Sequence, residues 1–527
     1  MSGEAVDWSS SREAIAATGM AIAAHAMAAP ERTAIIAAPG NRTFGELNGH
    51  ANQLVRGLRA RGLGPHSGVA LICSNRAEFM EVYAACMRAG FILTPVNWHL
   101  TGDEMAYIVG NCEAKAVIAE SRFAAAAAQA ASASSHVDIK LAVGGPIEGF
   151  TDYETFLAAH DAANIVDPTL GSPMLYTSGT TGNPKGVYRW PPRPSDALRS
   201  IMDRMLTFAP DNDLCLLTGP AYHAAPLQLN AVASLAFGVG LVMMDKWDAE
   251  ETLRLIDKHR IVYTHMVATM FTRMLRLPED VRNRYDLSSI KAVIHGAAPC
   301  PKHVKQAMID WFGPVFFEYY AATEGGATLA SSHDWLARPG TVGQPIGDSH
   351  FRVLDDQLNE RDAGVEGTVY IRAPDDGGFV YFKSREKTDA SYHGNYFTLG
   401  DHGYLDADGY LFLTGRHAEL IISGGVNIYP QEVDDVLLEL EVVHDACTIG
   451  VPDEEWGEAV KAVVQLAEGT APSEALAAEL LEHCRAHLAA FKCPRSIEFQ
   501  TGLPRLPSGK IQRHKVRAPF WVGHEQN

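Results

Sequence analysis

The stretch from Leu175 to Gly186 reads LYTSGTTGNPKG and contains residue types that can bind a polyanion. The eleven residues from Tyr176 to Gly186 include four Ser and Thr hydroxyls, three glycines and Lys185. Glycines have no Cβ, so successive backbone N–H groups can converge on one point, while hydroxyls add hydrogen-bond donors and the lysine adds a positive charge. The stretch therefore predicts a loop that binds phosphate groups.

An ordinary polar surface loop uses the same residue types, because Gly, Ser, Thr, Asn and Pro are also common in turns. The density of hydroxyls and the lysine at the end of the stretch favour the phosphate loop. A Walker A loop is excluded, since G-x-x-x-x-G-K-[ST] cannot be aligned with Gly179, Gly182 and Lys185.

The stretch resembles the phosphate-binding signature of the AMP-forming acyl-activating superfamily, which contains acyl-CoA synthetases, adenylation domains and firefly-type luciferases. Further stretches resemble superfamily segments in the expected order, so the resemblance covers about residues 30 to 515. One glycine-rich loop can arise by chance, whereas an ordered set is specific. The further stretches are Ala221–Pro226, His295–Pro299, Tyr319–Gly325, Tyr396–Asp401, Arg416–Pro430 and Pro504–Ile511.

The resemblance implies how ATP and AMP are bound. Tyr320 would stack on adenine, Thr323 would contact the α-phosphate, and Asp401 would accept hydrogen bonds from both ribose hydroxyls. Glu324 would ligate Mg²⁺, which prefers oxygen ligands and usually takes one or two carboxylates together with substrate phosphates. The full set implied for ATP and AMP is Thr177, Ser178, Gly179, Thr180, Thr181, Gly182, Lys185, Gly296, Ala297, Ala298, Tyr320, Ala321, Thr323, Asp401 and Arg416.

The same resemblance implies an acyl pocket with His223 beside the substrate carboxylate, although a lone histidine is more often a core residue. Ala321 replaces a commoner glycine of the superfamily and should narrow the space near the nucleotide slightly. The implied pocket residues are mostly apolar, which favours a hydrophobic acid: a medium or long acyl chain, a steroid side-chain acid or an aryl acid. They are His223, Leu227, Met266, Val267, Gly296, Ala297 and Ala321.

Three later segments are implied to serve the second half of a two-step reaction. Ser423, Gly424 and Gly425 would line the channel for the pantetheine arm of CoA, because bare backbone lets a narrow thiol arm pass. Ala418 stands where superfamily members commonly carry a hinge Asp or Lys, and alanine permits the backbone torsions of a hinge. Lys510 would be the catalytic lysine. The implied catalytic set is Lys510, Thr323, Glu324 and His223.

The implied reaction is that of an ATP-dependent acyl-CoA ligase, with ATP and CoA as co-substrates and Mg²⁺ as cofactor. A carboxylic acid and ATP would give acyl-AMP and pyrophosphate, and CoA would then give acyl-CoA and AMP. Transfer to a carrier protein or another acceptor stays open. A nucleotide-binding protein without catalysis is also open, but it would be expected to lack Lys185, Glu324 or Lys510, which are all present.

Composition narrows the class of protein. Of the 527 residues 47% are apolar and 20% charged, which is typical of a globular protein with two or more domains. The formal net charge of −19 excludes the basic footprint of a nucleic-acid-binding protein. The eight cysteines form no C-x-x-C pair, so we expect reduced thiols in the cytoplasm and no structural zinc. Glu4 and Asp7 argue against a signal sequence, and we expect no membrane anchor.

The elements that must position these residues follow from the apolar pattern. Short apolar runs such as Val69–Cys73 alternate with helical segments such as Glu78–Arg88, which predicts layered α/β structure with mostly parallel strands. The run from Leu227 to Met244 predicts a buried helix followed by a strand. Past Gly347, short alternating strands and Asp/Gly turns predict a small antiparallel β-subdomain.

The predicted fold class is therefore α/β, with a large N-terminal domain of layered α/β subdomains and a small β-subdomain, followed by a small mobile α+β domain. We expect residues 1–414 to bind ATP and the acid, residues 415–418 to form the hinge, and residues 419–527 to carry the catalytic lysine. The oligomeric state stays open, with a homodimer as one option.

Overall fold

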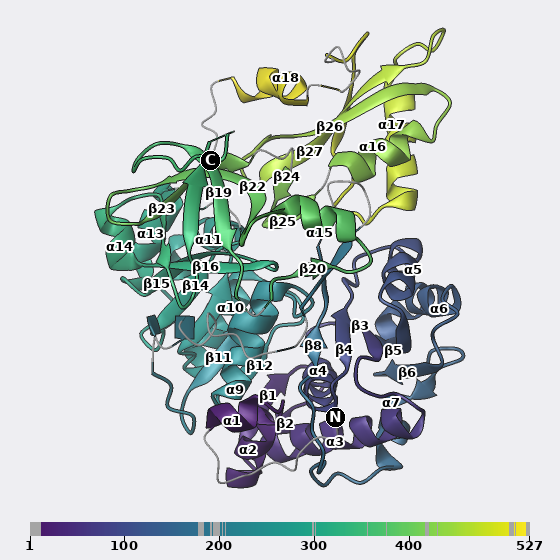
Figure 1. The fold of residues 1–527 in the computed structure, drawn as a ribbon, viewed down its shortest axis with the longest axis vertical. Coiled ribbons are helices and arrows are strands. Elements are labelled where there is room, and N and C mark those ends of the chain that lie inside the picture. The colour runs from purple at the N-terminus through teal and green to yellow at the C-terminus, as the bar shows by residue number, and fades with distance from the viewer. Residues whose placement is uncertain are drawn as a thin grey trace.

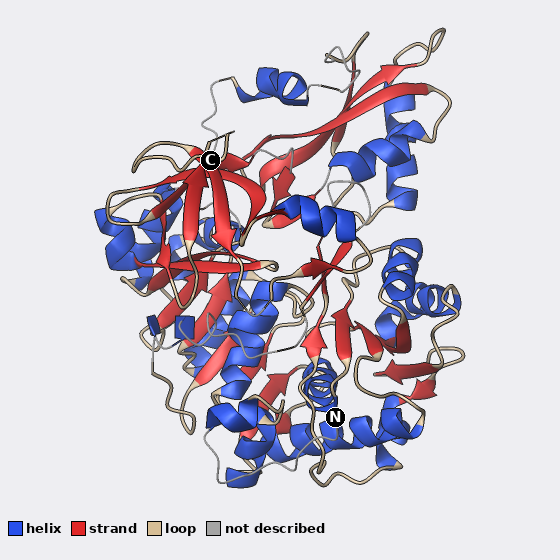
Figure 2. Ribbon diagram, in the orientation of Figure 1, coloured by secondary structure: helices blue, strands red, loops and turns tan. Residues whose placement is uncertain are grey.

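The structure is a computed structural model (Figures 1 and 2). It describes residues 12–177, 184–189, 192, 201–202, 204–205, 207–297, 300, 302–355, 357–375, 377–416, 421–428, 430–504, 511 and 513–522. Two large sheets with flanking helices lie side by side in the lower part of Figure 1, and the C-terminal elements lie above them.

The first sheet has six described strands, all parallel, in the order β7-β6-β5-β3-β4-β8. Every residue of β3 is buried, as expected for a parallel strand covered on both faces. The strands are β3 (Gly68–Ile72), β4 (Ile92–Pro95), β5 (Ala114–Glu120), β6 (Ile139–Val143), β7 (Thr151–Asp152) and β8 (Ser172–Pro173). The helices and 3-10 turn between them are α4 (Ala77–Ala89), α5 (Gly102–Asn111), η1 (Ser121–Phe123), α6 (Ala124–Ser132) and α7 (Tyr153–Ala158).

The second sheet has 14 strands within the described residues, and its first part is parallel in the order β1-β12-β11-β13-β14-β15. These strands are β1 (Thr33–Ala37), β11 (Leu214–Leu217), β12 (Gly240–Met243), β13 (Tyr263–Met266), β14 (Ala292–His295) and β15 (Phe316–Ala322), with β2 (Arg42–Thr43) antiparallel at the edge. The associated helices are α3 (Phe44–Ala60), the π-helix η2 (Pro226–Val232), α9 (Ala233–Ala236), α10 (Ala249–His259), α11 (Ala268–Leu275), α12 (Glu279–Arg282) and α13 (Lys302–Phe312).

Helix α4 joins the two sheets into one body, because it contacts β3 of the first sheet and β1 of the second. All of its residues are buried, including Glu78, Glu81 and Arg88. These charges are paired or hydrogen-bonded, as buried charges must be: Glu78 with Arg76, Glu81 with Arg42, and Arg88 with Asn48 and Asn52. The sheets thus share one apolar core.

The second sheet continues without a break into antiparallel strands, in the order β15-β16-β17-β23-β22-β19-β18. The predicted β-subdomain past Gly347 is therefore an extension of the large sheet. Its strands are β16 (Gly325–Ser331), β17 (Thr341–Pro345), β18 (Phe351–Leu354), β19 (Gly367–Arg372), β21 (Tyr392–His393), β22 (Tyr396–Leu405) and β23 (Leu411–Arg416). The helices here are α14 (Ser332–Ala337) and α15 (Arg385–Ser391).

A three-stranded antiparallel sheet holds the ends of the glycine-rich stretch. Strand β9 (Leu175–Thr177) pairs with β10 (Lys185–Tyr188), which also pairs with β20 (Val380–Tyr381). In the register Thr177 lies opposite Lys185. The two strands therefore bring both ends of the stretch to one place, while residues 178–183 lie outside the described residues.

The small C-terminal domain contains a five-stranded mixed sheet within the described residues, in the order β25-β24-β27-β26 with β28 beside β27. Its core contains Val433 and Leu437 of α16 and Leu480 and Cys484 of α17. The elements are β24 (Ile421–Ser423), β25 (Val426–Ile428), α16 (Pro430–Leu438), β26 (Val443–Asp453), β27 (Gly457–Leu466), α17 (Glu474–His487), β28 (Ser496–Phe499), α18 (Arg513–Arg517) and η3 (Ala518–Trp521).

At the N-terminus the described chain forms two helices, α1 (Arg12–Ala16) and α2 (Ala21–Ala28). They are separated at Gly19, whose φ is +79°. A Cβ at this position would clash with the Met87 carbonyl oxygen. Only glycine therefore lets the chain pass this close to α4.

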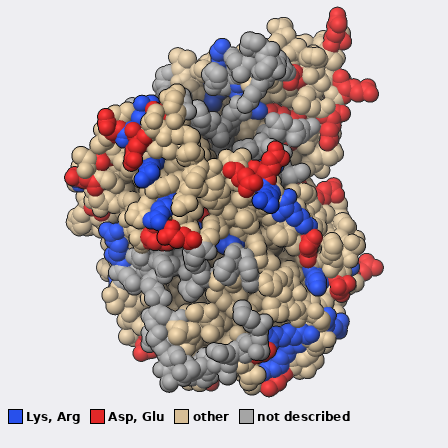
Figure 3. All heavy atoms as spheres, viewed as in Figure 1, with Lys and Arg blue, Asp and Glu red and all other residues tan. Residues whose placement is uncertain are grey.

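The run Leu227–Met244 forms η2, α9 and β12, in agreement with the predicted helix and strand. Within the described residues, none of the helices is both long and apolar enough to cross a membrane. On the face drawn in Figure 3, acidic and basic side chains are interspersed.

Candidate functional site

One large cavity of about 1510 Å³ runs between the two sheets and the C-terminal domain. It is lined by both ends of the glycine-rich stretch, by the β15–β16 hairpin, by η2 and by the turn between β24 and β25. Segments that are far apart in the sequence and that carry the motif residues therefore meet at one place.

Thr323 and Glu324 form the two-residue turn of the β15–β16 hairpin, since Ala322 pairs with Gly325. The tight turn presents both residues to the cavity. The Thr323 carbonyl accepts a hydrogen bond from Arg189 at 3.2 Å. Gly325 has φ +139°, and a Cβ there would come within 3.0 Å of Arg189, so glycine allows this close approach.

Glu324 is a buried carboxylate with 8% of its surface exposed. Its Oε1 accepts a hydrogen bond from the Tyr381 hydroxyl at 2.9 Å. Lys185 lies on the same tyrosine, with Nζ 4.6 Å from the centre of the ring. Burial and the charge of Lys387 lower the pKa of Lys185, and the charge of Glu324 acts in the opposite direction. Tyr381 thus separates an acid and a base that face one cavity.

Tyr320 and Asp401 meet across the hairpin and β22. The Tyr320 hydroxyl donates to Asp401 Oδ2 at 2.6 Å, and Asp401 is buried. Asp401 also lies opposite Arg416 in the register of β22 and β23; Arg416 is described by its backbone alone. An aromatic ring and a hydrogen-bonded carboxylate are therefore fixed relative to each other beside the cavity.

The buried His265 and the partly buried His223 lie near the other side of the cavity. Burial, assisted by the charge of His99, lowers the pKa of His223 to about 4. Burial, assisted by His223, lowers the pKa of His265 to about 3. His265 Nε2 is 3.0 Å from the Tyr319 hydroxyl. Both imidazoles are neutral at pH 7, so each can donate or accept a hydrogen bond without carrying a charge.

The predicted acyl-pocket residues fall into three groups. His223, Val267, Ala297 and Ala321 line the cavity. Leu227 and Met266 are fully buried and pack in hydrophobic core clusters. Gly296 approaches the Tyr319 carbonyl so closely that a Cβ would overlap it. The observed geometry therefore indicates that Gly296 allows close packing of two backbone segments.

The cavity also has an apolar extension that sequence reasoning missed. It is lined by Met80, Tyr83 and Met87 of α4 and by Leu229 and Val232 on η2 and its end. The motifs give no signal for these residues, because their position depends on the packing of α4 against η2. The apolar run Leu227–Met244 predicted a buried helix and not a helix that lines a cavity.

Gly424 and Gly425 form the turn between β24 and β25 and line the cavity from the C-terminal domain. Their φ values are +60° and +77°, in the left-handed region that favours glycine. A Cβ on Gly425 would lie 3.7 Å from Val267, which places this turn directly on the predicted acyl pocket. Ser423, at the end of β24, pairs with Gly457.

Several predicted residues lie outside the described residues: Ser178, Gly179, Thr180, Thr181, Gly182, Ala298, Ala418 and Lys510. The described part of the site nevertheless offers oxygen donors for a hard cation. Thr177, Thr323 and the Glu324 carboxylate line the same cavity. Mg²⁺ prefers such ligands, so the donor set fits this ion.

Comparison with known proteins gives matches along nearly the whole chain. A family model described as AMP-binding enzyme matches residues 22–377, and one described as AMP-binding enzyme C-terminal domain matches residues 432–510. The indoleacetate–CoA ligase of Aromatoleum aromaticum is 30% identical over 94% of this chain and 96% of its own.

Two further matches differ in the acceptor that their names state. The fatty acid–[acyl-carrier-protein] ligase ScoC of Streptomyces coeruleorubidus is 28% identical over 94% of this chain and 95% of its own. The structure of the amide bond synthetase McbA from Marinactinospora thermotolerans aligns over 96% of this chain and 99% of its own, with a TM-score of 0.84 and 26% identity.

Proposed function

This chain belongs to the family of AMP-binding enzymes, and from that premise we propose that it is an ATP-dependent ligase that joins a carboxylic acid to CoA. The superfamily resemblance and the fold class predicted from the motifs are thereby confirmed. The roles of the individual residues and the use of a carboxylic acid and CoA as the other two substrates are also part of the proposal.

The observation that carries the proposal is the convergence of the Glu324 carboxylate, Lys185 and Tyr320 on one cavity, with Asp401 hydrogen-bonded to Tyr320. A carboxylate at a tight turn suits a hard cation, an aromatic ring suits a base, and a lysine at the end of a glycine-rich stretch suits phosphate. These are the three parts of a nucleoside triphosphate bound with its cation.

In the first half-reaction the substrate carboxylate would attack the α-phosphorus of ATP, the bond to the β-phosphate oxygen would break, and pyrophosphate would leave. Hydroxide is a poor leaving group, whereas AMP is a good one, so the acyl carbon becomes reactive. The protein contributes positioning and charge neutralisation. Lys185 would bind the β- and γ-phosphates, Thr323 the α-phosphate, and Lys510 both carboxylate and α-phosphate. Mg²⁺ held by Glu324 would neutralise phosphate charge.

In the second half-reaction the thiolate of CoA would attack the acyl carbon and AMP would leave. Ser423, Gly424 and Gly425 would line the approach of the thiol arm. Rotation of the C-terminal domain at residues 415–418, with Ala418 as the hinge, would move Lys510 away from the acyl-AMP and bring this turn toward it. Residues 1–414 would then act as the ATP- and acid-binding domain and residues 419–527 as the mobile domain.

We propose a hydrophobic acid as substrate. His223, Val267, Ala297 and Ala321 would surround its carboxyl end, and the extension along α4 and η2 would receive its apolar body. Tyr83 within this extension has its pKa raised to about 12 by burial, against a hydrogen bond with Gln228 that lowers it. Tyr83 and Gln228 are both uncharged, so they could also hydrogen-bond to one oxygen atom on the ring or chain of the acid.

A second acceptor class is favoured by a specific observation. ScoC and McbA, which match nearly the whole chain, are named for transfer to a carrier protein and for amide bond synthesis. The same acyl-AMP could therefore pass to a carrier-protein thiol or to an amine. The described cysteines form no disulfide with one another and all but Cys300 are buried, which supports a reducing compartment such as the cytoplasm.

The test is a panel of aliphatic, steroid side-chain and aryl acids with ATP and Mg²⁺, in which pyrophosphate and AMP are measured with and without CoA. Pyrophosphate that depends on one acid class, with turnover that rises on CoA, supports the ligase and identifies the acid. Release that CoA leaves unchanged, but that a pantetheinylated carrier protein or an amine accelerates, supports the alternative acceptor. Absence of release across the panel supports a protein that binds nucleotide without catalysis.

A further inference from the structure

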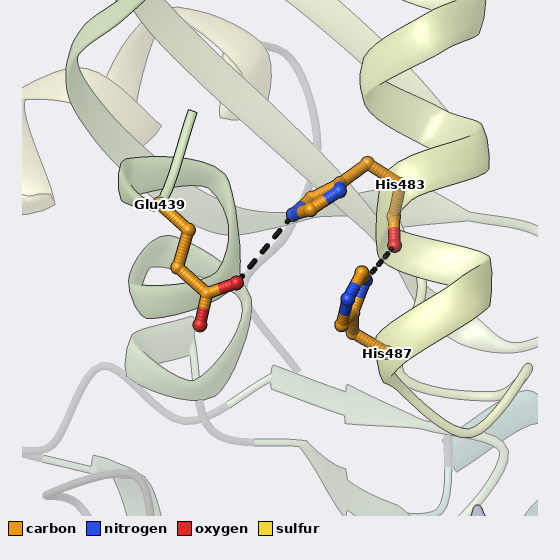
Figure 4. A group of neighbouring side chains, drawn as sticks. All are labelled: Glu439, His483 and His487. Carbon is orange, nitrogen blue, oxygen red and sulfur yellow. Dashed lines mark hydrogen bonds and ion pairs between the residues drawn. The ribbon is translucent and has the colours of Figure 1, made fainter. Parts of the chain in front are cut away.

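Helices α16 and α17 of the C-terminal domain bring together three possible metal ligands that do not line the cavity described above. Figure 4 shows His483 and His487 on α17 facing Glu439, which directly follows α16. The two histidines are four residues apart, a spacing that places their side chains on one face of a helix. One carboxylate oxygen and one nitrogen of each ring all lie within 4.8 Å of one another.

The hydrogen bond of His487 leaves its other ring nitrogen available for a metal ion. His487 Nδ1 lies 2.8 Å from the His483 carbonyl, to which it can only donate, so its proton is on Nδ1 and Nε2 carries a lone pair. A second interaction of this kind, from the far nitrogen to a backbone carbonyl, is typical of histidines that ligate metals.

His483 Nε2 provides the second, independent observation. It is buried and has no hydrogen-bond partner among the described residues. The Glu439 Oε2 atom lies 3.6 Å away, within the range of an ion pair but beyond a hydrogen bond. A buried nitrogen without a hydrogen bond is costly, and a bound cation would satisfy it. An ion pair of Glu439 and His483 alone would leave His487 unused.

We propose that Glu439, His483 and His487 form a binding site for a divalent transition-metal ion of the Zn²⁺, Co²⁺ or Ni²⁺ class. Two imidazole nitrogens and one carboxylate oxygen suit these ions, whereas Mg²⁺ and Ca²⁺ prefer oxygen ligands. Metal bonds of about 2.1 Å place tetrahedral ligands about 3.4 Å apart, so small rotations of the exposed Glu439 and His487 side chains complete the site. Water fills the remaining position.

The bound ion links the end of α16 to the end of α17 and so stabilises their packing. The C-x-x-C and H-E-x-x-H patterns of structural and catalytic zinc sites do not detect this arrangement, because its third ligand directly follows a different helix. The proposal does not depend on the reaction of the protein.

The experiment uses the full chain, freed of metal with a chelator and kept in excess Mg²⁺ so that oxygen sites are occupied. Co²⁺ and Zn²⁺ are titrated by calorimetry, the visible absorption of Co²⁺ is recorded, and the melting temperature is measured with and without Zn²⁺. The variants are Glu439→Gln and His487→Gln, both at exposed side chains. The control is His333→Gln, an exposed histidine on α14.

We expect one equivalent of Co²⁺ or Zn²⁺ to bind to wild type and to His333→Gln and to raise the melting temperature of both. Each site variant should bind the ion at least about tenfold more weakly, as loss of one ligand implies. Equal affinity and equal thermal shift in wild type and His487→Gln would overturn the proposal. So would a spectrum of octahedral Co²⁺ that is identical in all four proteins.

Discussion

Substitutions at Glu324 and Tyr381 can separate the proposed role of the buried carboxylate in binding a cation from its role in packing. Glu324→Gln keeps the shape and the acceptor oxygen for the Tyr381 hydroxyl but removes the charge that would hold the cation. We expect acyl-AMP formation to fall about 10²-fold, which is the typical cost of removing one pre-organised electrostatic group. Pyrophosphate release measured over a range of Mg²⁺ concentrations checks this.

The matched control is Tyr381→Phe, which removes the hydrogen bond and leaves the carboxylate. It should lower the rate only a few-fold, because a hydrogen bond that is made equally before and during the reaction contributes little to the barrier. If the two variants were equally slow, the carboxylate would act through its packing with Tyr381 and not through a bound cation.

The lowered pKa of His223 predicts a pH dependence of stability. The pKa of His223 is lowered by burial from 6.5 to about 4, so below pH 6.5 the unfolded chain takes up a proton that the folded chain does not. The free energy of unfolding therefore decreases as the pH falls from about 6.5 to 4. Between pH 7 and pH 5 this amounts to about 2 kcal/mol for His223.

Urea denaturation of wild type and His223→Gln at pH 7 and pH 5 measures this contribution, since all other titrating groups are common to both proteins. Wild type should lose about 2 kcal/mol more than the variant over this interval. An equal loss in the two proteins would mean that His223 is protonated in the folded state, and hence able to pair with a substrate carboxylate as a cation.

At the scale of elements, the β24–β25 turn offers a test of the second half-reaction. Gly425→Ala places a Cβ 3.7 Å from Val267 and forces alanine into a left-handed conformation at φ +77°. We expect pyrophosphate release to persist and acyl transfer to CoA to slow about tenfold, because a small displacement of a positioning element costs at least this much. Separate assays of the two half-reactions distinguish the effects.

Gly469→Ala is the control for backbone strain. Gly469 has φ +87° in the same domain, and a Cβ there meets open space. Both variants should lose about 1 kcal/mol of stability, the usual cost of a left-handed alanine. Slower acyl transfer in both would assign the effect to a weakened domain and would contradict a role of the turn in the channel.

The same elements show what the sequence could predict. The apolar run Val69–Cys73 corresponds to β3, and the alternating pattern past Gly347 corresponds to strands such as β19, because burial on both faces or alternation along a strand is visible in the local sequence. Motif order predicted that Thr323, Glu324 and Asp401 belong to one site. The π-helix and its apolar cavity could not be predicted, since they depend on the packing of α4 between two sheets.

For the whole molecule, polar contacts help to position the C-terminal domain, beside the apolar contact of Ala489 and Phe491 with the core of the first sheet. Lys492 Nζ lies 2.8 Å from Glu104 of α5 and 2.6 Å from Glu432 of α16, and all three side chains are largely buried. Burial lowers the pKa of Lys492, but the charges of Glu432 and Glu104 raise it by more, so the net shift is upward and Lys492 stays charged. Arg273 of α11 contacts Glu455 at 2.8 Å on the same interface. Polar contacts of this kind suit an interface that opens and closes.

Glu104→Gln should therefore loosen the domains without unfolding them. The amide oxygen can still accept from the Thr101 backbone at the start of α5, and Lys492 keeps Glu432 as its partner, so the buried cation is not left alone. Loss of about 1.4 kcal/mol at the interface shifts the balance between docked and undocked domains tenfold. Hydrogen exchange around residues 489–492 should accelerate, and X-ray scattering should show a larger radius of gyration.

Glu498→Gln provides the comparison, because Glu498 pairs with Lys461 inside the C-terminal domain. That variant should leave the scattering profile unchanged. If domain separation is a step of the reaction, Glu104→Gln should alter the rate of acyl transfer while its melting temperature stays near that of wild type. Faster exchange with no change in either half-reaction would mean that opening of this interface is not coupled to catalysis.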